Sequence, residues 1–371
     1  MTLIQIELSI AVIAFTIAII ILAYILKVNR SKRPNVVNIK RHTKNPIMSP
    51  QTHNEWETVG TFNPAAIQDK SGRVHLLYRA IGSDGVSRIG YASSKDGLNI
   101  DERLTYPVFA MLKPRQNIVQ EMPVDLKKID PIMYPSGGSW GGCEDPRLVH
   151  IDDKIYMTFN AFDGWDFIRI GVSIIKADDF FEKKWKWSKP FFISSKDKIN
   201  KNWLIFPEKI KGKFAILHTI VPEIKIEYVD NINATMKEID SPRKHGPQPG
   251  RIDFWDNMIR GAGPPPIKTD KGWLVLYHAM SKDEPHIGYK MGALLLDIND
   301  PKNVIARSPA PILVPNEWYE NDWKPGVVYA CGATIKDNIL YVYYGGGDKH
   351  ICVAHTPIDK MLEWLLKYGR I

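Results

Sequence analysis

Cysteine is scarce in this chain, and its scarcity argues against two classes of protein. The three cysteines, Cys143, Cys331 and Cys352, are far apart and odd in number, which disfavours a disulfide framework and a cysteine-rich metal site. Arginine blocks and aromatic-basic RNA-binding motifs are also missing, although the net charge is +8. Nucleic acid is therefore not an expected partner. The histidines are scattered without an HExxH-type motif, so no metal or organic cofactor is expected.

Long apolar runs are scarce as well, with one exception near the N-terminus. Residues 8–26 carry no charge and are rich in Ile, Leu, Ala and Val. At about 1.5 Å per helical residue they match roughly the hydrocarbon core of a bilayer. A cleaved signal peptide would carry Lys or Arg before its apolar core, but residues 1–7 hold Glu7 and no Lys or Arg. Residues 1–27 are therefore predicted to be a transmembrane anchor that contacts the lipid bilayer through residues 8–26.

The charges beside this run predict its orientation. Lys27, Arg30, Lys32 and Arg33 follow it directly, and positive charge favours the cytoplasmic side of a membrane. We expect a single-pass membrane protein whose large domain faces the cytosol. Residues 28–54 are basic and interrupted by proline, without a sustained apolar period, and are predicted to be a tether. The folded domain is then expected over residues 55–371.

Helical periodicity is nearly absent from that domain. Short runs of β-branched and aromatic residues alternate with Gly, Asp, Asn and Pro, which is typical of an all-β protein. A loose strand–turn–strand unit recurs five times, with strands near residues 89–93, 170–173, 226–228, 291–297 and 351–354. This recurrence predicts a five-bladed β-propeller rather than a β-sandwich. A short helix is expected only at the C-terminus, over residues 358–366.

The segment Gly142-Cys143-Glu144-Asp145-Pro146-Arg147 is the strongest candidate for chemistry, because it places two adjacent carboxylates beside a guanidinium. Pro146 restricts the residue before it, so Asp145 is expected in an extended conformation with its side chain held in a defined direction. This geometry suits a catalytic acid in a site that cleaves sugars. The alternative is a structural carboxylate, with Arg147 paired to Asp145 or to Glu144.

Together with other motifs, this segment resembles glycoside hydrolase family 130, the β-mannoside phosphorylases and β-mannosidases. The resemblance runs from Asn63 almost to the C-terminus and leaves the predicted anchor outside. Its further motifs are Asn63-Pro64, Leu77-Tyr78-Arg79, Phe206-Pro207-Glu208-Lys209-Ile210, Leu217-His218, the run GAGPPPI at 261–267, Tyr277-His278 and Tyr343-Tyr344-Gly345-Gly346. The family consists of five-bladed propellers, so the resemblance implies the same fold as the strand pattern.

The resemblance also implies roles for individual residues. Asp145 matches the catalytic acid of the family. The residues expected to bind phosphate are Arg79, Arg147, Lys209 and His218. The residues expected to bind substrate are Asn63, Glu144, Glu208, Asp256 and His278. One departure is Thr219, which stands where many phosphorylases of the family have an arginine.

The nucleophile remains open between phosphate and water. An inverting enzyme that uses water needs a second carboxylate about 6.5–9.5 Å from the acid, and the candidates are Glu208, Asp163 and Asp166. An enzyme that uses phosphate needs cations instead. Because a cytosolic domain has phosphate available, the favoured interpretation is a phosphorylase that cleaves a manno-oligosaccharide or a mannosyl-glucose and releases mannose 1-phosphate.

Two alternatives to the phosphorylase are kept. The first is an inverting β-mannosidase, which the departure at Thr219 favours. The second is a carbohydrate-binding propeller without catalysis, which retention of Asp145 beside two arginines disfavours. The sequence predicts neither the linkage, β-1,2 or β-1,4, nor the oligomeric state.

Overall fold

The chain divides into two units, Met1–Val36 and Val37–Ile371. The computed structural model describes three helical residues of the first unit, Phe15, Thr16 and Ile19, and in the second unit residues 37, 39–111, 137–163, 168–196, 198–241, 248–284 and 288–371. Within these ranges no helix is both long and apolar enough to cross a membrane. Apart from the three helical residues, the predicted anchor over residues 8–26 lies outside the described part of the chain.

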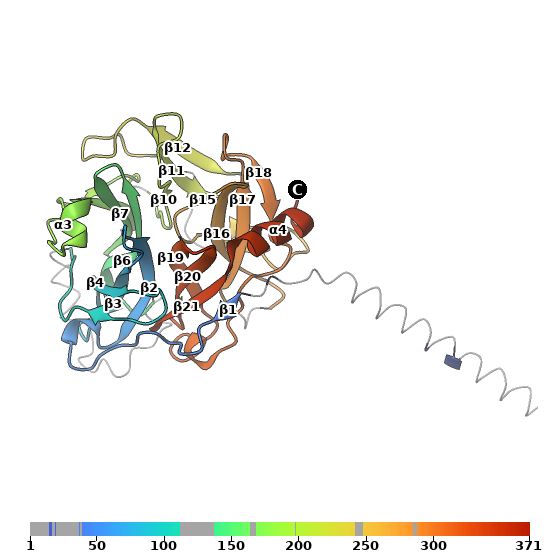
Figure 1. Cartoon of the computed structure of the whole chain (residues 1–371), viewed down its shortest axis with the longest axis horizontal. Helices are drawn as coiled ribbons and strands as arrows, with labels where there is room; N and C mark the ends of the chain where they lie inside the picture. Colours follow the sequence, from blue (N-terminus) through green and yellow to red (C-terminus); the bar gives the residue numbers. More distant parts are fainter. Residues whose placement is uncertain are drawn as a thin grey trace, which may run out of the picture. The chain divides into compact units, whose positions relative to one another are not determined.

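The second unit is built mostly of antiparallel strands, and consecutive strands pair as neighbours in meanders (Figure 1). The first two meanders share one sheet, because β4 and β6 pair in parallel over two residues each. The first contains β2 (Gly60–Gln68), β3 (Val74–Ile81), β4 (Val86–Ser94) and β5 (Glu102–Arg103). The second contains β6 (Gly141–Ile151), β7 (Lys154–Asp163), β8 (Ile168–Lys176) and β9 (Phe191–Phe192), with the short helix α3 (Ala177–Phe181) after β8.

Three further meanders follow along the chain, each in a sheet of its own. The third contains β10 (Leu204–Ile205), β11 (Phe214–Thr219) and β12 (Lys225–Val229). The fourth contains β13 (Gln248–Pro249), β14 (Met258–Ala262), β15 (Ile267–Thr269), β16 (Gly272–Met280), β17 (Lys290–Leu296) and β18 (Val304–Arg307). The fifth contains β19 (Val328–Lys336), β20 (Ile339–Gly346) and β21 (His350–Pro357).

The N-terminal strand β1 (Lys40–Arg41) completes the fifth meander by pairing with β21. Arg41 forms an ion pair with the buried Glu320, and Met48 is buried beside Ile351. The folded unit therefore begins at Val37, and the predicted boundary between tether and domain at residues 54–55 is wrong. A two-residue edge strand and isolated buried apolar residues are too short to produce the periodicity that marks a folded segment.

Apolar side chains join neighbouring meanders in a closed ring. Each of five buried clusters combines residues from two meanders, and the pairings run from first and second through to fifth and first. Representative members are Leu77 with Met157, Val172 with Ile216, Leu217 with Val275, Leu276 with Val328, and Tyr343 with Leu76. The five predicted recurrent strands coincide with β4, β8, β12, β17 and β21, the strand that follows the long central strand of each meander.

The predicted C-terminal helix is present as α4 (Ile358–Tyr368). Its apolar face buries Met361, Leu362 and Leu365 in the cluster shared by the fourth and fifth meanders. The three cysteines are free and buried, as expected of small core residues. The amphipathic period therefore predicted the helix correctly.

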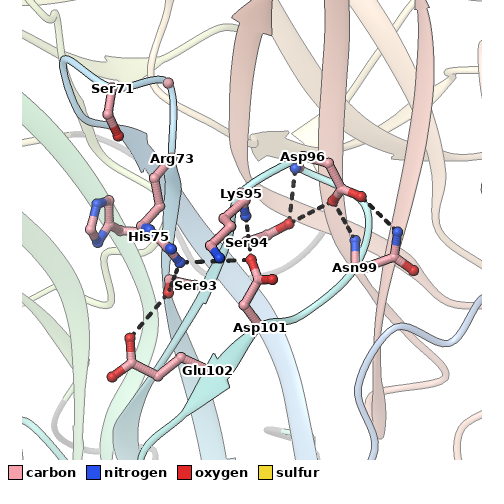
Figure 2. A network of polar contacts seen from close by, with 12 residues as sticks. Ser71, Arg73, His75, Ser93, Ser94, Lys95, Asp96, Asn99, Asp101 and Glu102 are labelled. Atoms are coloured by element: carbon pink, nitrogen blue, oxygen red, sulfur yellow. Dashed lines mark hydrogen bonds and ion pairs between the residues drawn. The ribbon is translucent and has the colours of Figure 1, made fainter.

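A polar network covers the end of the first meander where β4 turns toward β5 (Figure 2). Asp96 accepts hydrogen bonds from the backbone N–H groups of Leu98 and Asn99 and from the Ser94 hydroxyl. These bonds satisfy the turn, as expected for an aspartate at such a position. On β3, Val74 pairs with Ser94 at this end, whereas Arg79 pairs with Ile89 farther along the strand. The network therefore stabilises the turn and lies away from Arg79.

Candidate active site

Asp145 lies inside strand β6 at a β-bulge between Glu144 and Arg147. Its φ is +50°, in the left-handed region, so the expected extended conformation is wrong. The proline after it disfavours the right-handed helical region, and aspartate is one of the few residues that tolerate the left-handed one. A bulge redirects a side chain relative to its strand neighbours. Here it brings the Asp145 carboxylate among side chains from three other strands.

Three donors hold this carboxylate. Oδ1 accepts hydrogen bonds from Asn63 Nδ2 at 2.7 Å and from Arg79 Nη1 at 3.3 Å. Oδ2 accepts one from Asn160 Nδ2 at 3.2 Å. The donors come from β2, β3 and β7, which makes Asp145 the point where the first two meanders converge. Oδ2 has the single donor Asn160 among the described residues and is therefore the carboxylate oxygen with more room for a further hydrogen-bond partner.

Asn63 occupies on β2 the place that Asp145 occupies on β6. It precedes a proline, has a φ of +50° and lies in a bulge between Phe62 and Ala65. A side chain at Gly345 would collide with Asn63 Oδ1 and with the Asn63 backbone, so glycine is required there. The predicted substrate-binding residue Asn63 thus contacts the acid itself, and Gly345 of the Tyr-Tyr-Gly-Gly motif makes room for it.

Arg79 and Glu144 form a buried ion pair beside Asp145. Arg79 Nη2 donates to Glu144 Oε1 at 3.0 Å and to Ser139, and its Nε donates to Ser87. The second oxygen of Glu144 accepts from Lys201 Nζ at 3.0 Å. Glu144 was expected to bind substrate, but it is fully buried and both its oxygens bind cations. It therefore orients Arg79 and Lys201 around the acid.

Arg147 is a buried guanidinium without a carboxylate side chain as partner in the described part of the chain. Its Nε donates to Gly263 O at 2.9 Å and its Nη1 to Asp145 O at 2.8 Å. Its Nη2 contacts Asn202 Oδ1 at 3.1 Å and the Tyr329 hydroxyl at 3.5 Å. The alternative of an ion pair with Glu144 is thus contradicted. A buried cation held by neutral groups retains its charge for an anionic ligand.

Most of the charged side chains around Asp145 are cations. Burial alone raises the pKa of Asp145, but Arg79, Lys201 and Arg147, together with the Asn63 hydrogen bond, outweigh burial and hold that pKa below its ordinary value. Asp145 is consequently ionised at neutral pH when no anionic ligand is bound. Three cations face two carboxylates, Glu144 and Asp145, so the formal charge of this group is +3 − 2 = +1.

His278 and Tyr329 form the side of the site that lies on the fourth and fifth meanders. Their rings stack with centroids 4.1 Å apart, and the Tyr329 hydroxyl donates to Asn202 Oδ1 at 2.6 Å. Burial and the nearby Arg147 lower the pKa of His278 to about 3, so the ring is neutral. Its Nε2 accepts the Ala330 N–H at 2.8 Å. The predicted sugar-facing His278 is fully buried and supports Tyr329.

His218 lies on β11 of the third meander. It sits at a bulge between Leu217 and Thr219 on β11 and is buried against Trp203, the neighbour of Asn202. Its Nδ1 lies 3.2 Å from the Thr219 hydroxyl. The structure therefore places His218 next to the segment that carries Lys201 and Asn202.

Two predicted site residues lie elsewhere. Lys209 is exposed and pairs with Asp152 at 2.8 Å, and Asp152 follows the end of β6, seven residues and roughly 20 Å of strand from Asp145. Glu208 is half-buried and pairs with Lys268. Neither residue joins the group around Asp145. Their motif directly follows β10, and its charged residues end on the outer surface.

Asp256 has a structural environment rather than a sugar-facing one. It is fully buried and accepts hydrogen bonds from both Arg251 and Arg307 and from the Tyr277 hydroxyl at 2.6 Å. Two cations and a hydroxyl on one carboxylate form a satisfied buried network. Asp256 therefore stabilises the fourth meander.

Several residues of the site were missed from the sequence: Ser139, Asn160, Lys201, Asn202 and Tyr329. One signal was available for Asn160, which is a polar residue inside an otherwise apolar strand run. Lys201 and Asn202 directly precede the apolar run of β10 but belong to a lysine-rich stretch, whose usual interpretation is a solvated loop. Their convergence on Asp145 depends on tertiary packing.

Known proteins resemble the chain over nearly its whole length. The profile of glycoside hydrolase family 130, described as beta-1,4-mannooligosaccharide phosphorylase, matches residues 29–367. The chain therefore belongs to glycoside hydrolase family 130, the family of β-mannoside phosphorylases. This confirms the family resemblance that the sequence motifs indicated.

Relatives with an assigned activity include two proteins of one bacterium and one protein with a solved structure. A 1,2-beta-oligomannan phosphorylase of Thermoanaerobacter sp. (strain X514) is 37% identical over 86% of this chain and 97% of its own length. A beta-1,2-mannobiose phosphorylase of the same strain is 35% identical over 87% of this chain and 98% of its own. The solved structure of the beta-1,2-mannobiose phosphorylase from Listeria innocua aligns with a TM-score of 0.65 at 24% identity, covering 89% of this chain and 99% of that one, and shows a shared fold.

Proposed function

We propose that this chain is an inverting β-mannoside phosphorylase that cleaves β-1,2-linked oligomannosides with inorganic phosphate and releases mannose 1-phosphate. The observation that carries the proposal is Arg147, a buried guanidinium next to the acid that lacks a carboxylate partner in the described chain. Family membership supports the reaction class, and the two relatives above 30% identity support the β-1,2 linkage.

Asp145 acts as the general acid. The scissile oxygen needs a proton as the bond to the mannose carbon breaks, and Oδ2 is the carboxylate oxygen with room to deliver one. Phosphate attacks the opposite face of the ring, which inverts the configuration. Asp145 takes its next proton from solvent or from an incoming phosphate.

Water is a poorer candidate for the nucleophile because Glu144, Glu208 and Asp256 are each paired with a cation. Glu144 is bound by Arg79 and Lys201, and Asp256 by two arginines. Glu208 pairs with Lys268 on the outer surface. Asp163 is the last residue of β7, three residues after Asn160, and Asp166 lies outside the described residues. The cations around Asp145 favour an anion over water as the nucleophile.

The charge of the site fits a phosphate dianion. Protonation of Asp145 changes the formal charge of the group from +1 to +2, since three cations then face Glu144 alone. A dianion of charge −2 would neutralise that group. Thr219, which stands where many phosphorylases of the family have an arginine, contacts His218.

The closed ring of five antiparallel meanders supports a five-bladed β-propeller. The first strands of two meanders, β2 and β6, carry Asn63 and Asp145 at matching bulges. Five meanders that converge on one axis would bring residues 63, 145, 202 and 329 together although they are far apart in sequence. This fold is what positions the acid and the cations.

Residues 8–26 are proposed to anchor the enzyme in a membrane, with the catalytic domain in the cytosol, because the apolar run is followed by four basic residues. Full-length protein should then stay in the membrane fraction after an alkaline carbonate wash. Its recovery in the wash supernatant would contradict the anchor.

Linkage is tested by offering β-1,2- and β-1,4-mannobiose in phosphate buffer to the enzyme. We expect mannose 1-phosphate to form faster from the β-1,2-linked disaccharide. Faster phosphorolysis of the β-1,4-linked disaccharide would reject the proposed linkage and leave the reaction class intact.

A further inference from the structure

Asn202 forms hydrogen bonds with residues from several strands of the site. It is buried, it lies two residues before β10, and its φ is +65°. Asparagine is among the few residues that adopt this left-handed conformation without a large cost. Its backbone and side chain together reach residues of β6, β7, β14 and β19.

One arm of Asn202 reaches the acid through Asn160. The Asn202 N–H donates to Asn160 Oδ1 at 3.2 Å, and Asn160 Nδ2 donates to Asp145 Oδ2 at 3.2 Å. The first bond fixes which end of the Asn160 amide faces Asp145. With the amide reversed, its oxygen would repel the carboxylate or accept the proton that the substrate should receive. The Asn202 N–H therefore keeps Oδ2 available to the glycosidic oxygen.

The other arm of Asn202 holds the guanidinium of Arg147. Oδ1 accepts from Arg147 Nη2 at 3.1 Å and from the Tyr329 hydroxyl at 2.6 Å, while Nδ2 donates to Arg260 O at 3.3 Å. These partners fix the side-chain amide, because its oxygen faces two donors and its nitrogen faces a carbonyl. A neutral oxygen orients Arg147 without cancelling its charge, which a carboxylate at this position would do.

We propose that Asn202 is a positioning residue that sets the acid Asp145 and the phosphate-binding Arg147 in register with one another, the backbone N–H acting on the acid and the side chain on the guanidinium. The inference rests on the proposed phosphorylase function. The contributions of the backbone N–H and of the side chain can be tested separately, since a substitution can remove the side chain and keep the left-handed backbone.

Three substitutions test the two arms. Asn202→Gly keeps φ positive at no steric cost and removes only the side chain. We expect the dissociation constant of phosphate, measured by titration calorimetry, to rise by about tenfold or more, with kcat at saturating phosphate changed much less. Asn202→Asp keeps the shape and the tolerance of positive φ but places a carboxylate on Arg147. It should weaken phosphate binding more than Asn202→Gly does.

Asn202→Ala removes the side chain and also strains the backbone, because alanine disfavours positive φ. It should match Asn202→Gly in phosphate affinity and have a lower kcat, since the N–H that holds Asn160 moves. The matched control is Asn338, an exposed residue in the β19–β20 turn with φ +61°. Asn338→Gly and Asn338→Ala should leave phosphate affinity and kcat as in wild type.

A purely structural role gives a different order. The isosteric Asn202→Asp would then be the mildest variant, and unfolding temperatures would fall while phosphate affinity stayed constant. Either result, or an unchanged phosphate affinity in Asn202→Gly, overturns the proposal. If wild type itself neither binds nor requires phosphate, the proposed function fails, and the Arg147 arm fails with it. The acid arm is then decided by mannoside cleavage, and equal rates for Asn202→Ala and Asn202→Gly would reject it.

Discussion

Replacing Asp145 with asparagine should lower phosphorolysis of a natural β-mannoside by about two to four decades, the usual contribution of general acid catalysis. The asparagine can still accept hydrogen bonds from Asn63 and Arg79 through its oxygen, so the fold around it is retained. What it lacks is a transferable proton. Steady-state rates on mannobiose and on an aryl mannoside with an activated leaving group measure the effect.

The aryl mannoside serves as the control for Asp145→Asn. Its leaving group needs less protonation, so its rate should fall less. Equal losses on the two substrates would mean that another residue is the acid.

The same carboxyl couples phosphate binding to pH. Burial raises the pKa of Asp145, but the surrounding cations outweigh burial and hold that pKa below its ordinary value before phosphate binds. A bound phosphate dianion offsets those cations and raises that pKa, so the wild type should take up a proton as phosphate binds. Calorimetry in two buffers of different ionisation enthalpy detects this uptake. Asp145→Asn should bind phosphate without it.

Replacing Arg147 with alanine should raise the KM for phosphate by about 10- to 100-fold and change the KM for the mannoside little. A hydrogen bond to a charged group contributes about 1.5–3 kcal/mol, and the mannoside supplies no anion in its place. Arg147→Lys should restore part of the loss, because it keeps the charge and loses the planar fork. Initial rates at varied phosphate and fixed mannobiose measure both constants.

The control for Arg147 is Lys209, which the sequence motif assigned to phosphate. Lys209 is exposed and pairs with Asp152, so Lys209→Ala should leave the phosphate KM unchanged. A phosphate KM that responds to Lys209→Ala and not to Arg147→Ala would show that the anion binds elsewhere.

Much of the fold could be predicted from local pattern. Alternating apolar residues and turn chemistry indicated β4, β8, β12, β17 and β21, and the period of Met361, Leu362 and Leu365 indicated α4. The start of the domain was misplaced because β1 has only two residues and gains its stability by pairing with β21. Such a strand leaves no local signal, since its partner lies more than three hundred residues away in sequence.

The sequence predicted residues of the candidate site only where they belong to a recognisable motif. The pattern around Asp145, with its proline and arginine, indicated a carboxylate beside cations, and Arg79 and Arg147 both contact Asp145. Lys209 and Glu208 were misplaced because a motif gives residue identity and leaves the direction of the side chain open. Lys201 and Asn202 were missed because they are polar loop residues, and only tertiary packing brings them to the group around Asp145. The left-handed φ of Asp145 likewise follows from the bulge rather than from Pro146 alone.

The most direct test of the account is product analysis of β-1,2-mannobiose incubated with the enzyme, in phosphate buffer and in phosphate-free buffer. Phosphorolysis through Asp145 and Arg147 predicts mannose 1-phosphate and one equivalent of mannose with phosphate, and almost no cleavage without it. Undiminished release of free mannose in phosphate-free buffer would contradict the account, because water would then be the nucleophile and the cations would have another purpose.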